Sequence, residues 1–315
     1  MSSFAATVKN ELTRKEGTKA EAKAELEALV RMNGSLSLVN QGFVLQIQTE
    51  NAAIARRIFS LLKSLYHVQA EIVVQRKMKL KKNNVYIVRV RHHVDHILDD
   101  LAILKDGQIG AQVRAETWAS QATISAYLRG AFLAAGSVNN PETSSYHLEI
   151  YSWQALHQEE IMAMCNKYGL NARGIIRRGG YITYLKEANK ISDFLVLIGA
   201  MKAIMRFEDI RVVRDMRNAV NRLVNCENAN LNKTVDAAGR QLAMIRYIHD
   251  RVGLEALPER LQDVAWTRLK YPDVSMKELG QHVPNGPISK SGVNHRLRKI
   301  KKFAEDLEKD PFKGR

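Results

Sequence analysis

A run of basic and small polar residues near the C-terminus is the part of this sequence best suited to binding a polyanion. Between Ser289 and Lys302 the chain carries six lysines and arginines, and no acidic residue interrupts them. Guanidinium and ammonium groups neutralise phosphates, and short hydroxyl and amide groups reach base edges. We therefore expect this segment, with part of the one before it, to bind double-stranded DNA. The predicted DNA-binding residues are Ser275, Lys277, Ser289, Lys290, Ser291, Asn294, His295, Arg296, Arg298, Lys299 and Lys302.

The residues before this run predict a short helix and a tight turn. Ser275 and Glu278 have the spacing of a capping box, in which each side chain bonds the other's backbone amide. Residues 284–287 read Pro-Asn-Gly-Pro, which is typical of a turn. A second helix is expected to begin near Ser289 or Ser291.

The second helix has the pattern of a recognition helix. Val293, Leu297 and Ile300 recur at i, i+4 and i+7 and are expected to face a core. A helix anchored in this way on a preceding helix can enter the major groove of DNA. The alternative is a solvated cationic helix without a ligand. The residues expected on the face opposite the core are Lys290, Asn294 and Arg298.

Other patterns in the sequence do not support metal or cofactor chemistry. Residues 286–291 resemble a phosphate loop in composition, but the Gly-Lys-Ser order is absent and no strand precedes them. His92, His93 and His96 with Asp95 form the one metal-like cluster, and a polar junction between a strand and a helix accounts for it. No G-x-S-x-G or G-x-G-x-x-G motif is present. We expect no metal and no cofactor.

Composition agrees with a polyanionic partner. The chain has 315 residues, with 48 Lys+Arg against 33 Asp+Glu, a formal charge of +15 and a pI near 9.8. This balance favours nucleic acid first and an anionic membrane second. No apolar run has the length of a membrane span, and no signal segment is expected at the start. Two cysteines are too few to staple the fold, so we expect a cytoplasmic protein.

The elements upstream are expected to form an internal duplication. Residues 18–92 read as helix, two strands, helix and two strands, and the same order returns from about residue 126. At an offset of 102 residues, Gly34 falls on Gly136 and Tyr66 falls on Tyr168. A shared element order together with these matches indicates a repeat. From about Met205 the sequence is helical, with Asp236 and Gly253 as expected boundaries.

Residues 26–35 and 128–137 resemble the signature helices of the LAGLIDADG homing endonucleases. The resemblance implies two closely packed helices, for which Gly130 and Ala134 are suited, and a saddle-shaped sheet that lies on DNA. In that family each helix supplies an acidic metal ligand just before its final glycine. Those positions are Asn33 and Ala135 here, and without two carboxylates a Mg²⁺ ion is not held for cleavage. The resemblance therefore implies a scaffold without catalytic residues.

A degenerate LAGLIDADG pair followed by a helix-turn-helix domain is similar to the architecture of the WhiA family. The segments that carry this resemblance are residues 3–14, 129–150, 221–234 and 287–300. It implies a DNA-binding protein of cell division and chromosome segregation and, in spore-formers, of developmental transcription. The last domain is similar to the promoter-reading region of sigma factors.

On the endonuclease analogy, a second set of basic residues is expected near the DNA-facing sheet. The alternative is that these residues sit on solvated turns. Arg89 and Arg91 alternate with valines, which is expected to place both on one sheet face. The possible additional DNA surface comprises Arg76, Lys77, Lys79, Arg89, Arg91, Arg177 and Arg178.

The sequence thus predicts an α+β fold, with duplicated LAGLIDADG-type repeats forming a saddle sheet and an all-α helix-turn-helix domain after them. The expected boundaries are 1–125 and 126–205 for the two repeats, 206–252 for a helical connector and 253–315 for the DNA-binding domain. We expect a sequence-selective, non-enzymatic DNA-binding regulator in the cytoplasm, associated with the nucleoid. One alternative is an adaptor that recruits RNA polymerase or another regulator, and a weaker one is an active nuclease. The sequence does not determine the oligomeric state.

Overall fold

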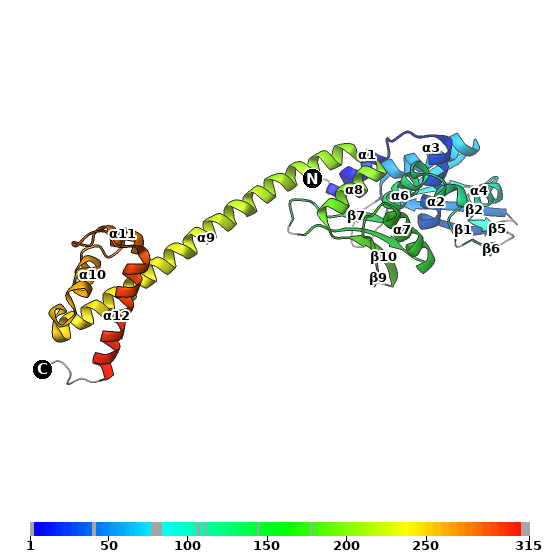
Figure 1. The fold of residues 1–315 in the computed structure, drawn as a ribbon. Coiled ribbons are helices and arrows are strands. Elements are labelled where there is room, and N and C mark those ends of the chain that lie inside the picture. The colour runs from blue at the N-terminus through cyan, green and yellow to red at the C-terminus, as the bar shows by residue number, and fades with distance from the viewer. Residues whose placement is uncertain are drawn as a thin grey trace. The chain divides into compact units, whose positions relative to one another are not determined.

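The computed structural model describes residues 3–39, 42–76, 84–105, 108–110, 112–143, 145–177 and 179–309. The chain divides into two compact units, Met1–Asp215 and Met216–Arg315 (Figure 1). The first is α/β and the second is built from helices.

The expected duplication is confirmed by the first unit. The first repeat consists of α2 (Lys19–Asn33), β1 (Gly34–Val39), β2 (Gly42–Thr49), α3 (Ala52–Tyr66), β3 (Ala70–Arg76) and β4 (Asn84–Val90). The second consists of α6 (Gln121–Ala135), β7 (Gly136–Val138), β8 (Leu148–Ser152), α7 (Ala155–Lys167), β9 (Arg173–Arg177) and β10 (Gly180–Leu185). The sheets have the orders β1-β2-β4-β3 and β7-β8-β10-β9, and every pair within them is antiparallel.

Four helices, two short strands and the N-terminal part of α9 (Met201–Val252) complete this unit, and of the six whole elements the sequence analysis expected only the helix after the histidine cluster, α4. The helix α1 precedes the first repeat, a small hairpin and two short helices connect the repeats, and α8 follows the second. They are α1 (Phe4–Leu12), α4 (Val94–Asp100), β5 (Leu104–Lys105), β6 (Gln108–Ile109), α5 (Ala115–Trp118) and α8 (Ala188–Ile198).

The helices α2 and α6 pack against each other where the two repeats meet (Figure 1). A Cβ atom on Gly130 would lie only 2.4 Å from the Glu25 carbonyl oxygen, so a larger residue would push the helices apart. This confirms the close packing expected of a small residue there. The expected apolar stripe of Leu26, Leu29 and Val30 is buried, but Glu25 and Glu27 of the same helix are fully buried as well.

The helix α9 (Met201–Val252) is continuous, so the expected boundary at Asp236 is wrong. No proline interrupts the segment, and an aspartate lowers helix propensity without preventing helical backbone. The helix ends at Gly253, which has a φ of 78°, a conformation that favours glycine.

The second unit contains the C-terminal part of α9, a 3₁₀ turn and three more helices. These are η1 (Leu254–Ala256), α10 (Glu259–Lys270), α11 (Met276–Gln281) and α12 (Lys290–Lys309). Its core includes Ile245, Ile248, Val264, Leu279 and Val293. Among the described residues of both units, no helix combines the length and the apolar character that crossing a membrane requires.

Candidate nucleic-acid interface

The helix α11 begins at the capping box that the sequence predicts. Ser275 Oγ accepts from the Glu278 amide at 3.3 Å, and Glu278 Oε2 accepts from the Ser275 amide at 2.9 Å. The backbone hydrogen bond from Ser275 lowers the pKa of Glu278. Because the Ser275 hydroxyl takes part in this cap, its position is fixed at the start of α11. Lys277, two residues on, is exposed.

A buried arginine that the sequence analysis missed fixes the loop before α11. The side chain of Arg268 in α10 is 1% exposed, and its Nη1 donates to the Val274 carbonyl at 2.7 Å and to the Pro272 carbonyl at 3.3 Å. Burial lowers the pKa of Arg268. This side chain ties α10 to the segment from which α11 starts.

The turn between α11 and α12 lies directly against α11. Ile288 donates its backbone N–H to the Gly280 carbonyl at 2.9 Å. A Cβ atom on Gly280 would lie 2.1 Å from the Ile288 carbonyl oxygen, so only glycine allows this approach. Gly286 has a φ of 100° in the same turn. The turn expected over residues 284–287 is therefore confirmed.

The helix α12 begins at Lys290, with Ser289 at its N-terminal cap. Ser289 Oγ accepts from the Gly292 amide at 3.2 Å and lies 2.8 Å from Ser291 Oγ. Val293, Leu297 and Ile300 are buried as expected, at 0%, 4% and 0% exposure. The exposed members of the predicted DNA-binding set on α12 are Lys290, Ser291, Asn294, His295, Arg298, Lys299 and Lys302.

The three residues expected opposite the core lie instead on one flank of α12. Asn294 and Arg298 line a hollow shared with Met244 and Tyr247 of α9, and Lys290 lines another with Lys233 of α9. The reason is geometric, because at about 100° per residue Lys290, Asn294 and Arg298 lie only about 60°, 100° and 140° around the helix from the buried Val293. The positions most nearly opposite the buried stripe are those of Ser291, His295 and Lys302.

Arg296 has an intramolecular contact that sets it apart from the other cations of α12. Its side chain is half-buried, and Nη1 donates to the Arg260 carbonyl of α10 at 3.2 Å. Lys301 is exposed and lies 3.4 Å from Glu305 in an ion pair one turn away. Arg298, Lys299 and Lys302 have no ion pair within the described part of the chain.

In the first unit, the ends of α2 and α6 meet at a pocket of about 350 Å³ that both Asn33 and Ala135 line. Asn33 Nδ2 donates to the Ala134 carbonyl at 3.4 Å, so it joins the two helix ends. Lys9 lines an adjoining pocket, and burial lowers its pKa to about 8. Neither helix end presents a carboxylate to the place where they meet.

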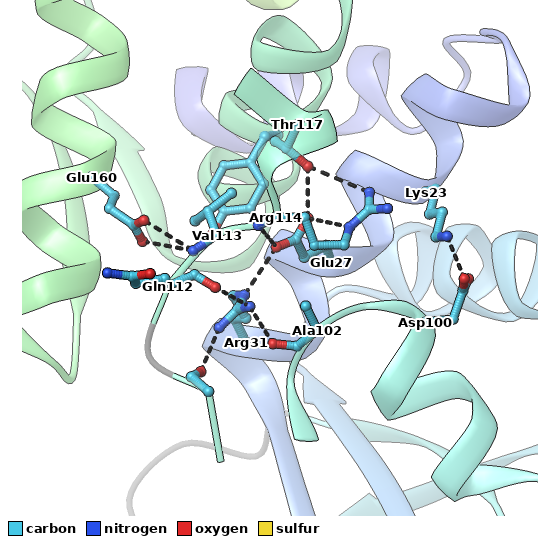
Figure 2. A network of polar contacts seen from close by, with 12 residues as sticks. Lys23, Glu27, Arg31, Asp100, Ala102, Gln112, Val113, Arg114, Thr117 and Glu160 are labelled. Carbon is cyan, nitrogen blue, oxygen red and sulfur yellow. Dashed lines mark hydrogen bonds and ion pairs between the residues drawn. The ribbon is translucent and has the colours of Figure 1, made fainter. Parts of the chain in front are cut away.

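The buried acid Glu27 of α2 is engaged in structural contacts (Figure 2). Its carboxylate accepts from the Arg114 side chain at 2.9 Å, the Thr117 hydroxyl at 2.7 Å and the Arg31 side chain at 3.1 Å. Arg31 also donates to the carbonyls of Ala102 and Gly110, at 2.9 Å and 2.8 Å. This network fastens the end of α2 to the connection between the repeats. The sequence analysis missed it.

The described residues contain no group of three or more His, Cys, Asp or Glu side chains placed to hold a metal ion. His96 of the histidine cluster stacks edge-on against Tyr66 instead, with ring centroids 6.1 Å apart.

The second predicted basic set is only partly brought together. Arg76 on β3 and Arg177 on β9 are exposed, while Arg89 on β4 is half-buried. Arg91 lies just beyond the end of β4, and its Nε is 3.9 Å from Oε2 of Glu71, the β3 residue that pairs with Arg89. The shared face expected for the two arginines stays a prediction. Lys77, Lys79 and Arg178 lie outside the described residues.

Comparison with known families matches three segments of the chain. Residues 19–104 match the WhiA N-terminal LAGLIDADG-like domain, 124–217 the WhiA LAGLIDADG-like domain, and 220–304 the WhiA C-terminal HTH domain. The segments cover both repeats and the helical unit.

Similar proteins match over nearly the whole chain. A protein named "Probable cell division protein WhiA" from Enterococcus faecalis is 61% identical over 305 residues, 97% of this chain and 98% of that relative. One of the same name from Limosilactobacillus reuteri is 58% identical over 99% of both chains. The crystal structure of full-length DUF199/WhiA from "Thermatoga maritima" matches with a TM-score of 0.60 and 27% identity, covering 97% of this chain and 99% of that one. The chain therefore belongs to the WhiA family.

Proposed function

We propose that this chain is a sequence-selective, non-catalytic DNA-binding protein that regulates transcription in connection with cell division. The observation that carries the proposal is the arrangement of α11 and α12. Both helices are capped, a glycine-dependent turn joins them, and the basic residues of α12, with no acidic residue among them up to Lys302, are exposed to solvent except for the half-buried Arg296. Membership of the WhiA family, with relatives named as probable cell division proteins, supports the same function.

Within this proposal the residues of α11 and α12 divide by contact. Ser291, His295 and Lys302, with Arg298 and Lys299 beside them, are placed to meet the groove and its phosphates. Ser275 and Ser289 cap the two helices, since their hydroxyl oxygens accept from the Glu278 and Gly292 amides, and we propose that the same hydroxyls donate to phosphate oxygens. Lys277, Lys290, Asn294 and Arg296 complete the proposed DNA-binding set from the flanks.

The LAGLIDADG-like half has a binding or shaping role in this proposal. For the whole chain we propose the boundaries expected from the sequence. These are 1–125 and 126–205 for the two repeats, 206–252 for the connector and 253–315 for the DNA-binding domain. The proposal includes no phosphodiester cleavage, since Asn33 and Ala135 occupy the positions of the metal-binding acids. Arg76, Arg89, Arg91 and Arg177 extend the DNA surface over the sheets. We propose that the whole protein acts in chromosome segregation and, in spore-formers, in sporulation. We propose that it does so in the cytoplasm, associated with the nucleoid.

The test is selection of sheared genomic DNA on the purified full chain, in Mg²⁺ buffer at about 150 mM salt, where non-specific binding is weak. We expect a few enriched loci with intact ends. Fresh ends at a recurrent sequence would instead establish a nuclease. Absence of any enrichment would favour the second candidate, an adaptor that recruits RNA polymerase or another regulator and contacts DNA only secondarily.

A further inference from the structure

A row of asparagines follows one face of α9 within the C-terminal unit. Alternating steps of three and four residues separate its members, which are Asn218, Asn221, Asn225, Asn228 and Asn232. At about 100° and 1.5 Å per residue, they share an arc of about 80° and extend over about 21 Å of the helix. All five are exposed. We call this set the asparagine stripe.

The stripe has no role in stabilising α9 itself. Asparagine is a poor residue for a helix interior because its amide competes with the backbone for hydrogen bonds. In the described structure none of the five side chains forms a hydrogen bond with another group of the chain. Their donors and acceptors are therefore available to another molecule.

Cations flank the stripe on both sides. Arg217 lies on one side, and Arg222 and Lys233 lie on the other, each about 60–80° around the helix from Asn225, the middle member of the stripe. All three are exposed, and the described residues place no ion pair on them. Asp236, the next residue on this face, marks the end of the stripe.

The stripe points away from the core of its own unit. Ile245 and Ile248, which α9 buries in that core, lie on the opposite side of the helix. The exposed apolar side chains Met216, Val220 and Leu223 continue that opposite side. The stripe itself carries no large apolar side chain, which is unlike the centre of a protein–protein interface.

The chemistry of the stripe complements adenine in duplex DNA. A carboxamide donates and accepts at once, and the major-groove edge of adenine offers the matching N7 acceptor and N6 donor. The major groove admits an α-helix, and phosphates line both of its walls. A central row of carboxamides between two rows of cations fits that cross-section.

We propose that the asparagine stripe of α9 enters the major groove of A·T-containing duplex DNA and reads it as a second surface, separate from α12. This inference rests on the proposed DNA-binding function and lengthens its site. A single helix-turn-helix contacts a short half-site. The stripe supplies further sequence contacts from the same chain.

The experiment compares two alanine variants of the full chain on the duplex that the wild-type protein enriches most. Asn221→Ala/Asn225→Ala/Asn228→Ala removes the centre of the stripe, and alanine favours the helix, so α9 stays folded. Asn230→Ala is the matched control, because it changes the same residue type about 140° around the helix from Asn225. Asn230 contacts Cys226 Sγ at 3.8 Å.

We expect the triple variant to bind that duplex at least about tenfold more weakly, since the loss of one base contact has about this effect. The dependence of affinity on salt should stay unchanged, because the lost groups are neutral. Asn230→Ala should bind as the wild type does. Replacing the A·T pairs that the stripe reads by G·C should weaken the wild type and leave the triple variant unaffected.

Unchanged affinity of the triple variant, with Arg298→Ala still weakening binding, would overturn the inference and leave the proposed function standing. An equal loss on every sequence with a flatter salt dependence would also overturn it, because it would indicate phosphate contact alone. If the wild-type chain binds no duplex, the proposed function fails and the inference with it.

Discussion

Arg129 Nε of α6 donates to Glu25 Oε2 of α2 at 2.9 Å, and this contact joins the two repeats inside the first unit. Both side chains are buried, at 2% and 0% exposure. Arg57 of α3 donates to the same carboxylate through Nε and Nη2, at 2.8 Å and 3.0 Å. Glu25 is thus a buried anion between two guanidinium groups. It holds α2, α3 and α6 together at the position where Gly130 brings the two long helices close.

Replacing Arg129 by methionine should destabilise the first unit by about 3 kcal/mol, because it removes one partner of a buried ion pair. Denaturant unfolding of the full chain, followed by amide hydrogen exchange of residues 121–135, measures the loss. Arg76→Met, at an exposed site, is the control and should change stability by less than about 0.5 kcal/mol. Equal effects of the two variants would show that the contact is not stabilising.

The stability of the first unit should fall in mild acid because of His157. This side chain is 5% exposed and lies 2.6 Å from the Tyr127 hydroxyl, and burial, with a smaller effect from Arg31, lowers its pKa to about 4. An unfolded chain takes up this proton near pH 6.5, whereas the folded chain does so only near pH 4. The stabilisation is therefore complete above about pH 6.5 and is lost between pH 6.5 and 4, by up to about 3 kcal/mol.

The measurement is the free energy of unfolding at pH 7 and at pH 4.5, for the wild type and for His157→Gln, which keeps a partner for Tyr127. The wild type should lose more stability than the variant over this range. If the two lose the same amount, His157 is not the group that links protonation to unfolding.

Features set by neighbouring residues were predictable from the sequence. The capping box at Ser275 depends on residues three apart, and the buried stripe of Val293, Leu297 and Ile300 depends on one helical period. The duplicated order of helices and strands follows from local hydrophobic patterns, and the close approach at Gly130 follows from a small residue on an apolar helix. Each of these signals lies within one element or is repeated along the chain.

Features that join distant segments were not predictable. Glu25 and Glu27 sit in an alanine- and glutamate-rich helix that reads as solvated on its acidic side, and their partners Arg129 and Arg114 lie 104 and 87 residues away. Burial of a charge depends on such partners, and one sequence does not show which cations will meet it. The fixing of α11 by Arg268 was missed for a different reason, because its acceptors are backbone carbonyls four and six residues on, and a carbonyl gives no signal in the sequence.

Two glycines of the second unit should respond oppositely to alanine. Gly280→Ala places a Cβ atom 2.1 Å from the Ile288 carbonyl oxygen, so the turn must move and stability should fall by about 1–3 kcal/mol. Gly239→Ala, in the interior of α9 with nothing within 4 Å of the added atom, should raise stability by up to about 1 kcal/mol. Thermal unfolding of the two variants measures the change in stability. DNA affinity, measured well below the unfolding temperature, shows whether each folded variant still binds. A neutral Gly280→Ala would mean that the turn does not depend on this approach.

The salt dependence of DNA binding should report the cations of α12 one at a time. If Arg298 neutralises a phosphate, Arg298→Ala should weaken binding to all sequences alike. It should also reduce the slope of log affinity against log salt by about 1, because one fewer counterion is released. Lys63→Ala, at an exposed position on α3 in the first unit, is the matched loss of charge and should leave the slope as it is.

Asn294→Ala, a neutral change beside Arg298, should alter the preferred sequence at a cost of about 1–3 kcal/mol without changing the slope. Titration of each variant at four or more salt concentrations separates the three outcomes, and an unchanged slope for Arg298→Ala would remove this side chain from the phosphate contacts.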